Sequence, residues 1–347
     1  MQKYEFTGER AMVIGDDVRR EIIIHRIRST IDIPEYGVMA GDLGGFIEKE
    51  SNLSHAGHCW VGGEACVYGY AKVHGNAQVT GDAHVYDCAD ISGHAQVRDN
   101  ATVCGNANIY GRANIIADSI VTDGALVLQA ATIDGTASIG GNAKIYGHVY
   151  ISDNVRVYGQ ANVYGDVRVT ESARIHGEAR VWGNAEIRGN SVVTGFAQVY
   201  ENAKVLGDAH VREHAKVHQY AKVFEGAKVF GNADVRSVSR VYGDAKVSGN
   251  MVLDGFVHIC EGDLHESKTV TCDEVRRELP YLHTLLMRSK PEVEPKKPFE
   301  LWKHTANMSM YIAEDFAYLD HMYSDPLDDR SRYMASYAES MSVNCYN

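Results

Sequence analysis

Ala71-Lys-Val73-His-Gly75-Asn-Ala77 is one unit of the six-residue pattern that decides the fold of this chain. Every sixth residue from Val61 to Ile259 is Val, Ile or Leu, and no insertion or deletion breaks this register. Most of these aliphatic residues are followed two positions later by Gly and four positions later by Ala. A hexapeptide period of this kind is typical of a β-helix.

The position of a residue within the hexad predicts its place in a coil. Ala71 and Val73 are two residues apart, so in a strand both point inward, while Lys72 points outward. Gly75 follows at the corner, where glycine adopts left-handed backbone angles without strain. Three hexads close one triangular coil, and about 200 residues therefore give about 11 coils. Each coil covers the strand edges of the previous one, so only the two ends need caps.

The hexads resemble the left-handed β-helix of hexapeptide-repeat proteins, a superfamily that includes acyltransferases and γ-type carbonic anhydrases. The left hand is implied by this resemblance and not by the period. The segment Gly41-Asp-Leu-Gly-Gly-Phe-Ile-Glu-Lys-Glu-Ser-Asn-Leu-Ser54, followed by Cys59-Trp60-Val61, is similar to a narrower group. These are the YdcK-like bacterial and phage proteins, which are often labelled acetyltransferases. The resemblance covers residues 1–260, although the common acyltransferase hexad has Gly one residue after the aliphatic position rather than two.

We therefore predict an all-β solenoid, a left-handed parallel β-helix, with a different segment at each end. The predicted segments are a small N-terminal β cap at 1–54, the hexapeptide-repeat β-helix at 55–262, a helix and proline-bearing linker at 263–298, and a C-terminal α-helical segment at 299–347. Within the cap, residues 3–6 and 19–28 are predicted to be strands and residues 41–45 a turn.

Composition and charge indicate the cellular compartment of the chain and the class of its partners. The seven cysteines are scattered and form no CxxC pair, which favours reduced thiols in the cytoplasm over a disulfide framework. The start of the chain lacks the layout of a signal peptide, and no apolar run is long enough for a membrane span. The formal net charge of −12 argues against nucleic acid as the main partner.

Outward residues one coil apart lie above one another, so that each outward column can be read as a ladder. One column, here called the aromatic column, is large and apolar in six successive coils: Tyr110, Leu128, Tyr146, Tyr164, Trp182 and Tyr200. Leu126 lies beside Leu128 and widens it. Three interpretations are open, namely local stacking between strands, a self-association face, and a binding surface for an extended ligand or a foreign protein. Hexapeptide-repeat proteins typically form trimers along one face, which favours a homotrimer.

The segment after the linker carries aromatic and methionine side chains in a helical pattern. The candidates for docking a protein partner there are Trp302, Met310, Tyr311, Phe316 and Tyr323. Packing within the chain or between subunits is the alternative role for these residues.

The outward histidines are the candidates for catalytic chemistry. In the acyltransferases that the hexads resemble, a histidine general base lies near a subunit interface and coenzyme A lies along the helix. His176 and His218 are the candidates for that role, although no loop is extruded between residues 61 and 259 to build a pocket. A zinc site needs three converging ligands, whereas His210, His214 and His218 fall on different strands and a corner. No metal site is predicted.

We predict a non-enzymatic, self-associating scaffold or protein-binding β-helix, and the resemblance implies a phage or prophage origin. This interpretation requires no cofactor. One alternative is a coenzyme A-dependent acyltransferase that uses acetyl-CoA. A second alternative is an inhibitor that captures a host protein through its C-terminal helices.

Overall fold

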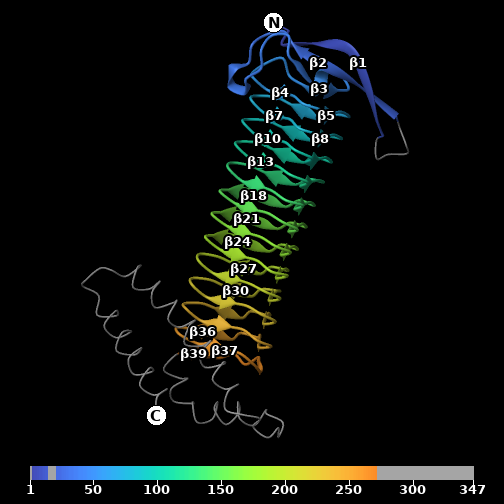
Figure 1. Cartoon of the computed structure of the whole chain (residues 1–347). Coiled ribbons are helices and arrows are strands. Elements are labelled where there is room, and N and C mark those ends of the chain that lie inside the picture. Colours follow the sequence, from blue (N-terminus) through green and yellow to red (C-terminus); the bar gives the residue numbers. More distant parts are fainter. Residues whose placement is uncertain (1, 15–20, 272–347) are drawn as a thin grey trace, which may run out of the picture. The chain divides into compact units, whose positions relative to one another are not determined.

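The computed structural model describes residues 2–14 and 21–271, which belong to one compact unit, Met1–Leu279. Apart from two short 3-10 turns, regular structure in these residues consists of β-strands. Figure 1 shows the strands as a stack of coils that begins below an N-terminal group of longer strands.

Three parallel sheets form the three faces of the stack. The first face has 12 strands: β4 (Trp60–Val61), β7 (Gln78–Val79), β10 (Gln96–Val97), β13 (Asn114–Ile115), β16 (Thr132–Ile133), β19 (Tyr150–Ile151), β22 (Arg168–Val169), β25 (Glu186–Ile187), β28 (Lys204–Val205), β31 (Lys222–Val223), β34 (Arg240–Val241) and β37 (His258–Ile259).

The second face belongs to a 15-stranded sheet that also holds three strands of the N-terminal cap, β1 (Tyr4–Ile14), β2 (Glu21–Ser29) and β3 (Leu43–Ile47). Its coil strands are β5 (Cys66–Val67), β8 (His84–Val85), β11 (Thr102–Val103), β14 (Ile120–Val121), β17 (Ser138–Ile139), β20 (Arg156–Val157), β23 (Arg174–Ile175), β26 (Val192–Val193), β29 (His210–Val211), β32 (Lys228–Val229), β35 (Lys246–Val247) and β38 (Asp263–Leu264).

The third face has 12 strands: β6 (Lys72–Val73), β9 (Asp90–Ile91), β12 (Asn108–Ile109), β15 (Leu126–Val127), β18 (Lys144–Gly147), β21 (Asn162–Gly165), β24 (Arg180–Gly183), β27 (Gln198–Val199), β30 (Lys216–Val217), β33 (Asp234–Val235), β36 (Val252–Asp254) and β39 (Thr269–Thr271).

Neighbouring coils pair in the register that the hexad predicts. Val163 lies opposite Val181, and the Asn162 amide donates to the Ala179 carbonyl at 2.9 Å. The stack also continues past the last in-register position, because Val247 pairs with Leu264 and Leu253 with Val270 after the chain has lost one residue from the period. The predicted solenoid is therefore confirmed, with 12 coil strands on each face where about 11 coils were expected.

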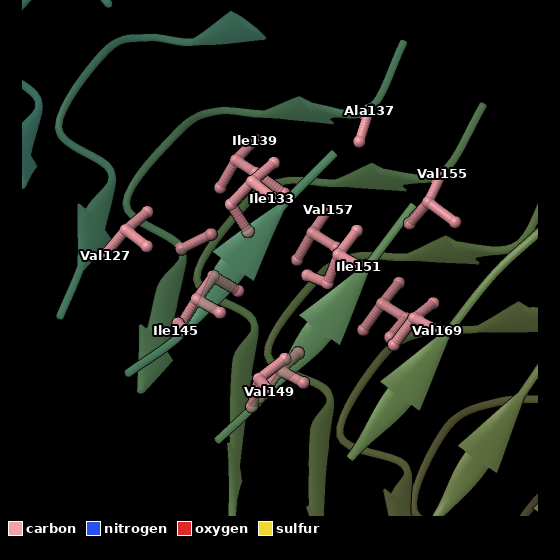
Figure 2. Packing of buried hydrophobic residues seen from close by; sticks show 14 of the residues in the cluster. Val127, Ile133, Ala137, Ile139, Ile145, Val149, Ile151, Val155, Val157 and Val169 are labelled. Carbon is pink, nitrogen blue, oxygen red and sulfur yellow. The ribbon is translucent and has the colours of Figure 1, made fainter. Parts of the chain in front are cut away.

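The core is the column of aliphatic and small residues inside the coils, and Figure 2 shows part of it. Ile145 and Val163 are fully buried, as is the small residue at most corners. Valine takes the place of the corner alanine at Val149, Val155 and Val167, and these side chains are also fully buried. Since each buried Val, Leu or Ile contributes about 1.5–3 kcal/mol, this repeated core is the main source of stability.

The corners keep left-handed backbone angles even where the sequence lacks glycine. In the coil whose turns depart from the pattern, Ala117, Asp123 and Gln129 have φ values of 58°, 57° and 63°. The Asp123 carboxylate accepts a hydrogen bond at 2.8 Å from the amide of Gly141, the equivalent position in the next coil. Aspartate tolerates this geometry better than most residues. The altered coil therefore conserves the turn and changes only the surface.

The N-terminal cap continues the second face. β1 (Tyr4–Ile14) pairs antiparallel with β2 (Glu21–Ser29), and β2 pairs antiparallel with β3 (Leu43–Ile47). β3 then runs parallel to β5, so the cap joins the coils through backbone hydrogen bonds. The 3-10 turns η1 (Pro34–Tyr36) and η2 (Glu50–Asn52) lie between and after these strands. β1 extends well past the predicted strand at 3–6, and β2 falls within about two residues of the predicted strand at 19–28. β3 begins inside the stretch 41–45 that was predicted to be a turn.

Candidate interaction surface

The aromatic column runs along one edge of the coils, because each member lies in the last part of a strand of the third face or directly after one. Tyr146 and Tyr164 lie opposite each other in the register, as do Tyr164 and Trp182. The other members, Tyr110, Leu128 and Tyr200, follow β12, β15 and β27. The structure thus brings together all the residues that the sequence placed in this column.

Four of these residues form a continuous stack of rings. Tyr146 and Tyr164 have ring centroids 4.9 Å apart, Tyr164 and Trp182 5.8 Å, and Trp182 and Tyr200 4.3 Å. The ring planes are within 3° of parallel in each pair. Since the faces of the rings cover one another, each half-buried ring presents its rim to the outside.

His218 continues the aromatic column beyond the six residues predicted from the sequence. Its ring stacks on Tyr200 with centroids 4.5 Å apart, and its Nε2 lies 2.8 Å from Oδ1 of Asp234. The signal was present, because His218 is one coil beyond Tyr200. Its residue type, a histidine, suggests a general base as readily as a stacking ring. In the structure His218 is the last ring of the stack, and the Asp234 carboxylate contacts its imidazole.

The stack ends differently at its other side. Leu128 separates the Tyr146 ring from Tyr110, whose exposed fraction is 41%. Leu126 lies on β15 beside Leu128, and the altered coil also exposes Ile120 on β14. The column therefore passes from a continuous ring stack to a part with an aliphatic residue, Leu128, between the rings of Tyr146 and Tyr110.

The hydroxyls of Tyr146 and Tyr200 stay protonated near neutral pH, because the pKa of each is raised. Burial, followed by the neighbouring Tyr164, raises the pKa of Tyr146, and Arg180 partly offsets this. Burial, followed by Asp234 and Glu201, raises the pKa of Tyr200. A neutral phenol both donates and accepts hydrogen bonds, so the rim of the column offers polar groups together with apolar ring edges. This combination is common at protein interfaces.

His176 lies apart from the aromatic column, next to β23 on the second face. Its ring stacks on Tyr158 at 4.8 Å, and its Nδ1 lies 2.9 Å from the Thr194 hydroxyl. Burial and then the charge of Arg174 lower its pKa. His176 and His218 are therefore not brought together, and each is engaged by its own stack and a polar neighbour.

Two shallow hollows mark the described surface, with volumes of about 540 Å³ and 420 Å³. The first is lined by Glu35, His94, Gln96, Arg112, Asn114 and Thr132, and the second by His214, Lys216, Asn232, Asp234, Asn250 and Val252. Neither hollow includes His176 or His218. Within residues 2–14 and 21–271, no group of three His, Cys, Asp or Glu side chains is arranged to hold a metal ion.

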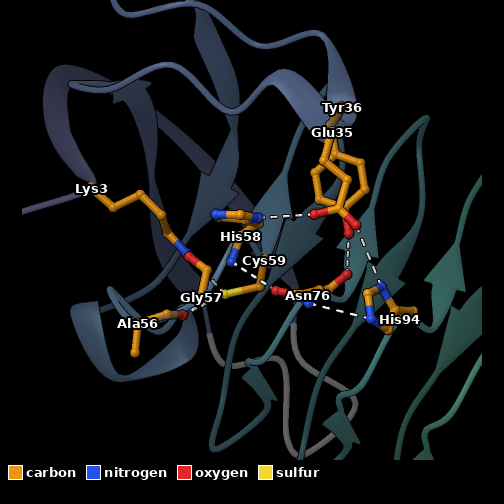
Figure 3. Close-up of polar contacts among 9 residues, drawn as sticks. All are labelled: Lys3, Glu35, Tyr36, Ala56, Gly57, His58, Cys59, Asn76 and His94. Carbon is orange, nitrogen blue, oxygen red and sulfur yellow. Dashed lines mark hydrogen bonds and ion pairs between the residues drawn. The ribbon is translucent and has the colours of Figure 1, made fainter.

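A polar cluster that the sequence did not predict fastens the cap to the first coils (Figure 3). The Glu35 carboxylate lies 2.9 Å from Nδ1 of His58 and 3.5 Å from Nδ1 of His94. The hydroxyl of the adjacent Tyr36 donates to the Asn76 carbonyl. No sequence period links Glu35 to these partners, so only the structure reveals the contact.

The partner-docking candidates Trp302, Met310, Tyr311, Phe316 and Tyr323 lie outside the described residues. In comparisons with known proteins, no family model matches the chain, and no curated protein matches it. No helix in the described part of the chain has the length and apolar character to span a membrane. The fold and the aromatic column therefore carry the functional argument.

Proposed function

We propose that this chain is a self-associating β-helical scaffold whose copies meet along the aromatic column. The observation that carries the proposal is the uninterrupted ring stack from Tyr146 to His218, half-buried at one edge of the coils. From Tyr110 to Tyr200 the column extends about 24 Å at the usual spacing of neighbouring strands. An ordered apolar surface of this length is characteristic of an interaction site.

A second copy of the chain is the partner that suits this surface best. The ring rims repeat once per coil, and another copy presents the same repeat with the same spacing. Two columns can therefore match rung for rung over their whole length, which an irregular surface cannot do. Three copies around a three-fold axis parallel to the long axis of the coil stack would give a closed cyclic trimer with equivalent contacts.

Membership in the YdcK-like group stays a proposal that rests on residues 41–61. Binding of acetyl-CoA distinguishes the acyltransferase alternative from the scaffold. A ligand that binds only the folded chain raises its thermal unfolding midpoint. If the chain is a scaffold, acetyl-CoA should leave the thermal unfolding midpoint unchanged. A saturable rise in the midpoint would favour the acyltransferase.

Replacing Tyr164 and Trp182 by Glu together tests the proposal. Two carboxylates buried between copies would repel each other and lack partners, so the variant should be a 38.2 kDa monomer in light scattering. The wild-type chain should have a mass several times larger. A matched control replaces Tyr158 and His176, which form a comparable stack on the second face, by Glu, and this control should keep the wild-type mass.

Two results would reject the proposal. One is a wild-type chain that is already monomeric at micromolar concentration. The other is a Tyr164→Glu/Trp182→Glu variant that keeps the wild-type mass while its circular dichroism shows intact strands.

A further inference from the structure

Lys3 is buried immediately before β1 and points at the sulfur of Cys59 (Figure 3). Its exposed fraction is 1%, and that of Cys59 is 0%. The Lys3 Nζ lies 2.9 Å from the Cys59 Sγ and 3.4 Å from the Gly57 carbonyl oxygen. Cys59 Sγ also contacts the carbonyl oxygens of Ser54 and Ala56, at 3.3 Å and 3.7 Å.

This surrounding is unusual for a lysine. A buried ammonium is normally paired with a carboxylate, because an unpaired charge is costly away from water. Among residues 2–14 and 21–271, no carboxylate forms an ion pair with Lys3. The nearest reactive group is the Cys59 sulfur, and the nitrogen and sulfur are already in contact. The pair is therefore placed for a reaction between its two members.

We propose that Lys3 and Cys59 are the site of an oxidative cross-link in which one oxygen atom bridges Nζ and Sγ. The separation of 2.9 Å favours this bridge over a direct bond. An inserted oxygen spans a gap close to the one observed. A direct nitrogen–sulfur bond would require the two atoms to come much closer, against the packing of β1 on the first coil.

The oxidant is a peroxide, and the reaction balances in two steps from the neutral amine and thiol. In the first step the Cys59 thiol takes one oxygen from hydrogen peroxide, which gives a sulfenic acid and releases one water. In the second step the sulfenic oxygen bonds to Lys3 Nζ. One hydrogen leaves the nitrogen and one leaves the oxygen, and a second peroxide accepts both and becomes two waters. Sulfur and nitrogen each lose two electrons, and the two peroxides gain four.

The geometry favours the second step over further oxidation of the sulfur. The amine is held against the site of the new oxygen, so its effective concentration there is far above that of a reagent in solution. The product would join the first strand of the cap to the first coil. Because a cross-link between residues 3 and 59 restricts the unfolded chain, it should raise the thermal unfolding midpoint.

Mass spectrometry of the full chain after hydrogen peroxide treatment tests the proposal. Digestion should release a peptide pair containing Lys3 and Cys59, heavier than the two peptides by one oxygen and lighter by two hydrogens. A thiol reductant should separate the pair. The exposed Cys88 reports that the peroxide has acted. Cys66 is buried at 8% exposure and contacts the Glu64 carbonyl, so it is the matched thiol and should form no cross-link.

Two variants strengthen the test. Cys59→Ser and Lys3→Met should each abolish the peptide pair and the peroxide-induced rise in unfolding temperature. Three results in the wild-type chain would overturn the proposal, and none depends on a variant folding. These are a Cys59 sulfinic or sulfonic acid beside free Lys3, an unmodified pair when Cys88 is fully oxidised, and a Lys3–Cys59 link that lacks the oxygen.

Discussion

Trp182 stacks on Tyr200 with ring centroids 4.3 Å apart and planes 2° from parallel. On its other side it stacks on Tyr164 at 5.8 Å. Stacked aromatic pairs contribute about 0.5–1.5 kcal/mol each beyond the area they bury. Trp182→Ala should therefore lower the free energy of unfolding by about 1–3 kcal/mol in urea denaturation.

Trp182→Phe is the matched control, because it keeps a ring in the column and should lose much less. Both variants need the same protein concentration as the wild-type chain, since dissociation and unfolding are linked in an oligomer. If Trp182→Ala unfolds at the wild-type urea concentration, the stack contributes nothing to stability.

The sequence predicted the coils well because their contacts repeat. Once Val163 and Val181 are known to pair, every other coil contact from Val61 to Val241 follows by the same offset. The aromatic column could be located in the same way. The parallel orientation of its ring planes could not be predicted from the repeat, because it depends on side-chain rotamers that the six-residue period does not determine.

The contacts of the cap had no such repeat to reveal them. Lys3 reaches Cys59 and Glu35 reaches His94 across long stretches of chain, and no spacing in the sequence indicates either contact. His218 shows a different limit. Its position one coil beyond Tyr200 follows from the period, but a histidine side chain is compatible with both catalysis and stacking, and only the structure shows that it stacks on Tyr200.

Asp123 offers a test of the corners that lack glycine. It combines a φ of 57° with a hydrogen bond of 2.8 Å from the Gly141 amide. Asp123→Ala removes that bond and places a less tolerant residue in a left-handed conformation. We expect a loss of about 1–3 kcal/mol in the free energy of unfolding.

Two further variants separate the two effects at Asp123. Asp123→Gly relieves the backbone but lacks the acceptor, so it should be more stable than Asp123→Ala and differ from wild type by about 1 kcal/mol or less. Asp123→Asn keeps an acceptor and should resemble wild type. Equal stabilities of the Ala and Gly variants in urea denaturation would contradict a role for the backbone angle.

Gly189 tests the close approach of successive corners. A Cβ there would lie 2.5 Å from the carbonyl oxygen of Gly207 and 2.6 Å from its nitrogen, and φ is +80°. Gly8 has a similar φ of +89° but has no atom within 4 Å of the added Cβ. Gly8→Ala should therefore cost about 1–2 kcal/mol for the backbone angle alone.

Gly189→Ala should cost clearly more, because the backbone of two coils must also move apart. Thermal and urea unfolding of the two variants measure this difference. If Gly8→Ala is as damaging as Gly189→Ala, the backbone angle and not the packing of the corners sets the requirement for glycine.

His258 makes the last coils sensitive to acid. Burial, followed by the charges of Arg240 and Lys222, lowers its pKa to about 4 from a usual value of 6.5. Its Nε2 is shielded from solvent and has no hydrogen-bond partner among the described residues. Between pH 6.5 and about 4 the unfolded chain binds a proton at this ring and the folded chain does not. Stability should consequently fall as the pH decreases through this window, by up to about 1.4 kcal/mol per pH unit and about 3 kcal/mol in total.

His258→Gln cannot gain this proton, so it should remove that part of the acid sensitivity. Urea denaturation of both chains at several pH values between about 7 and 4 measures the effect. The wild-type free energy of unfolding should decrease more steeply than that of the variant, and the two curves should be parallel above pH 6.5. Parallel curves over the whole range would mean that His258 is protonated in the folded chain, and that the last coils are open enough to let water reach its Nε2.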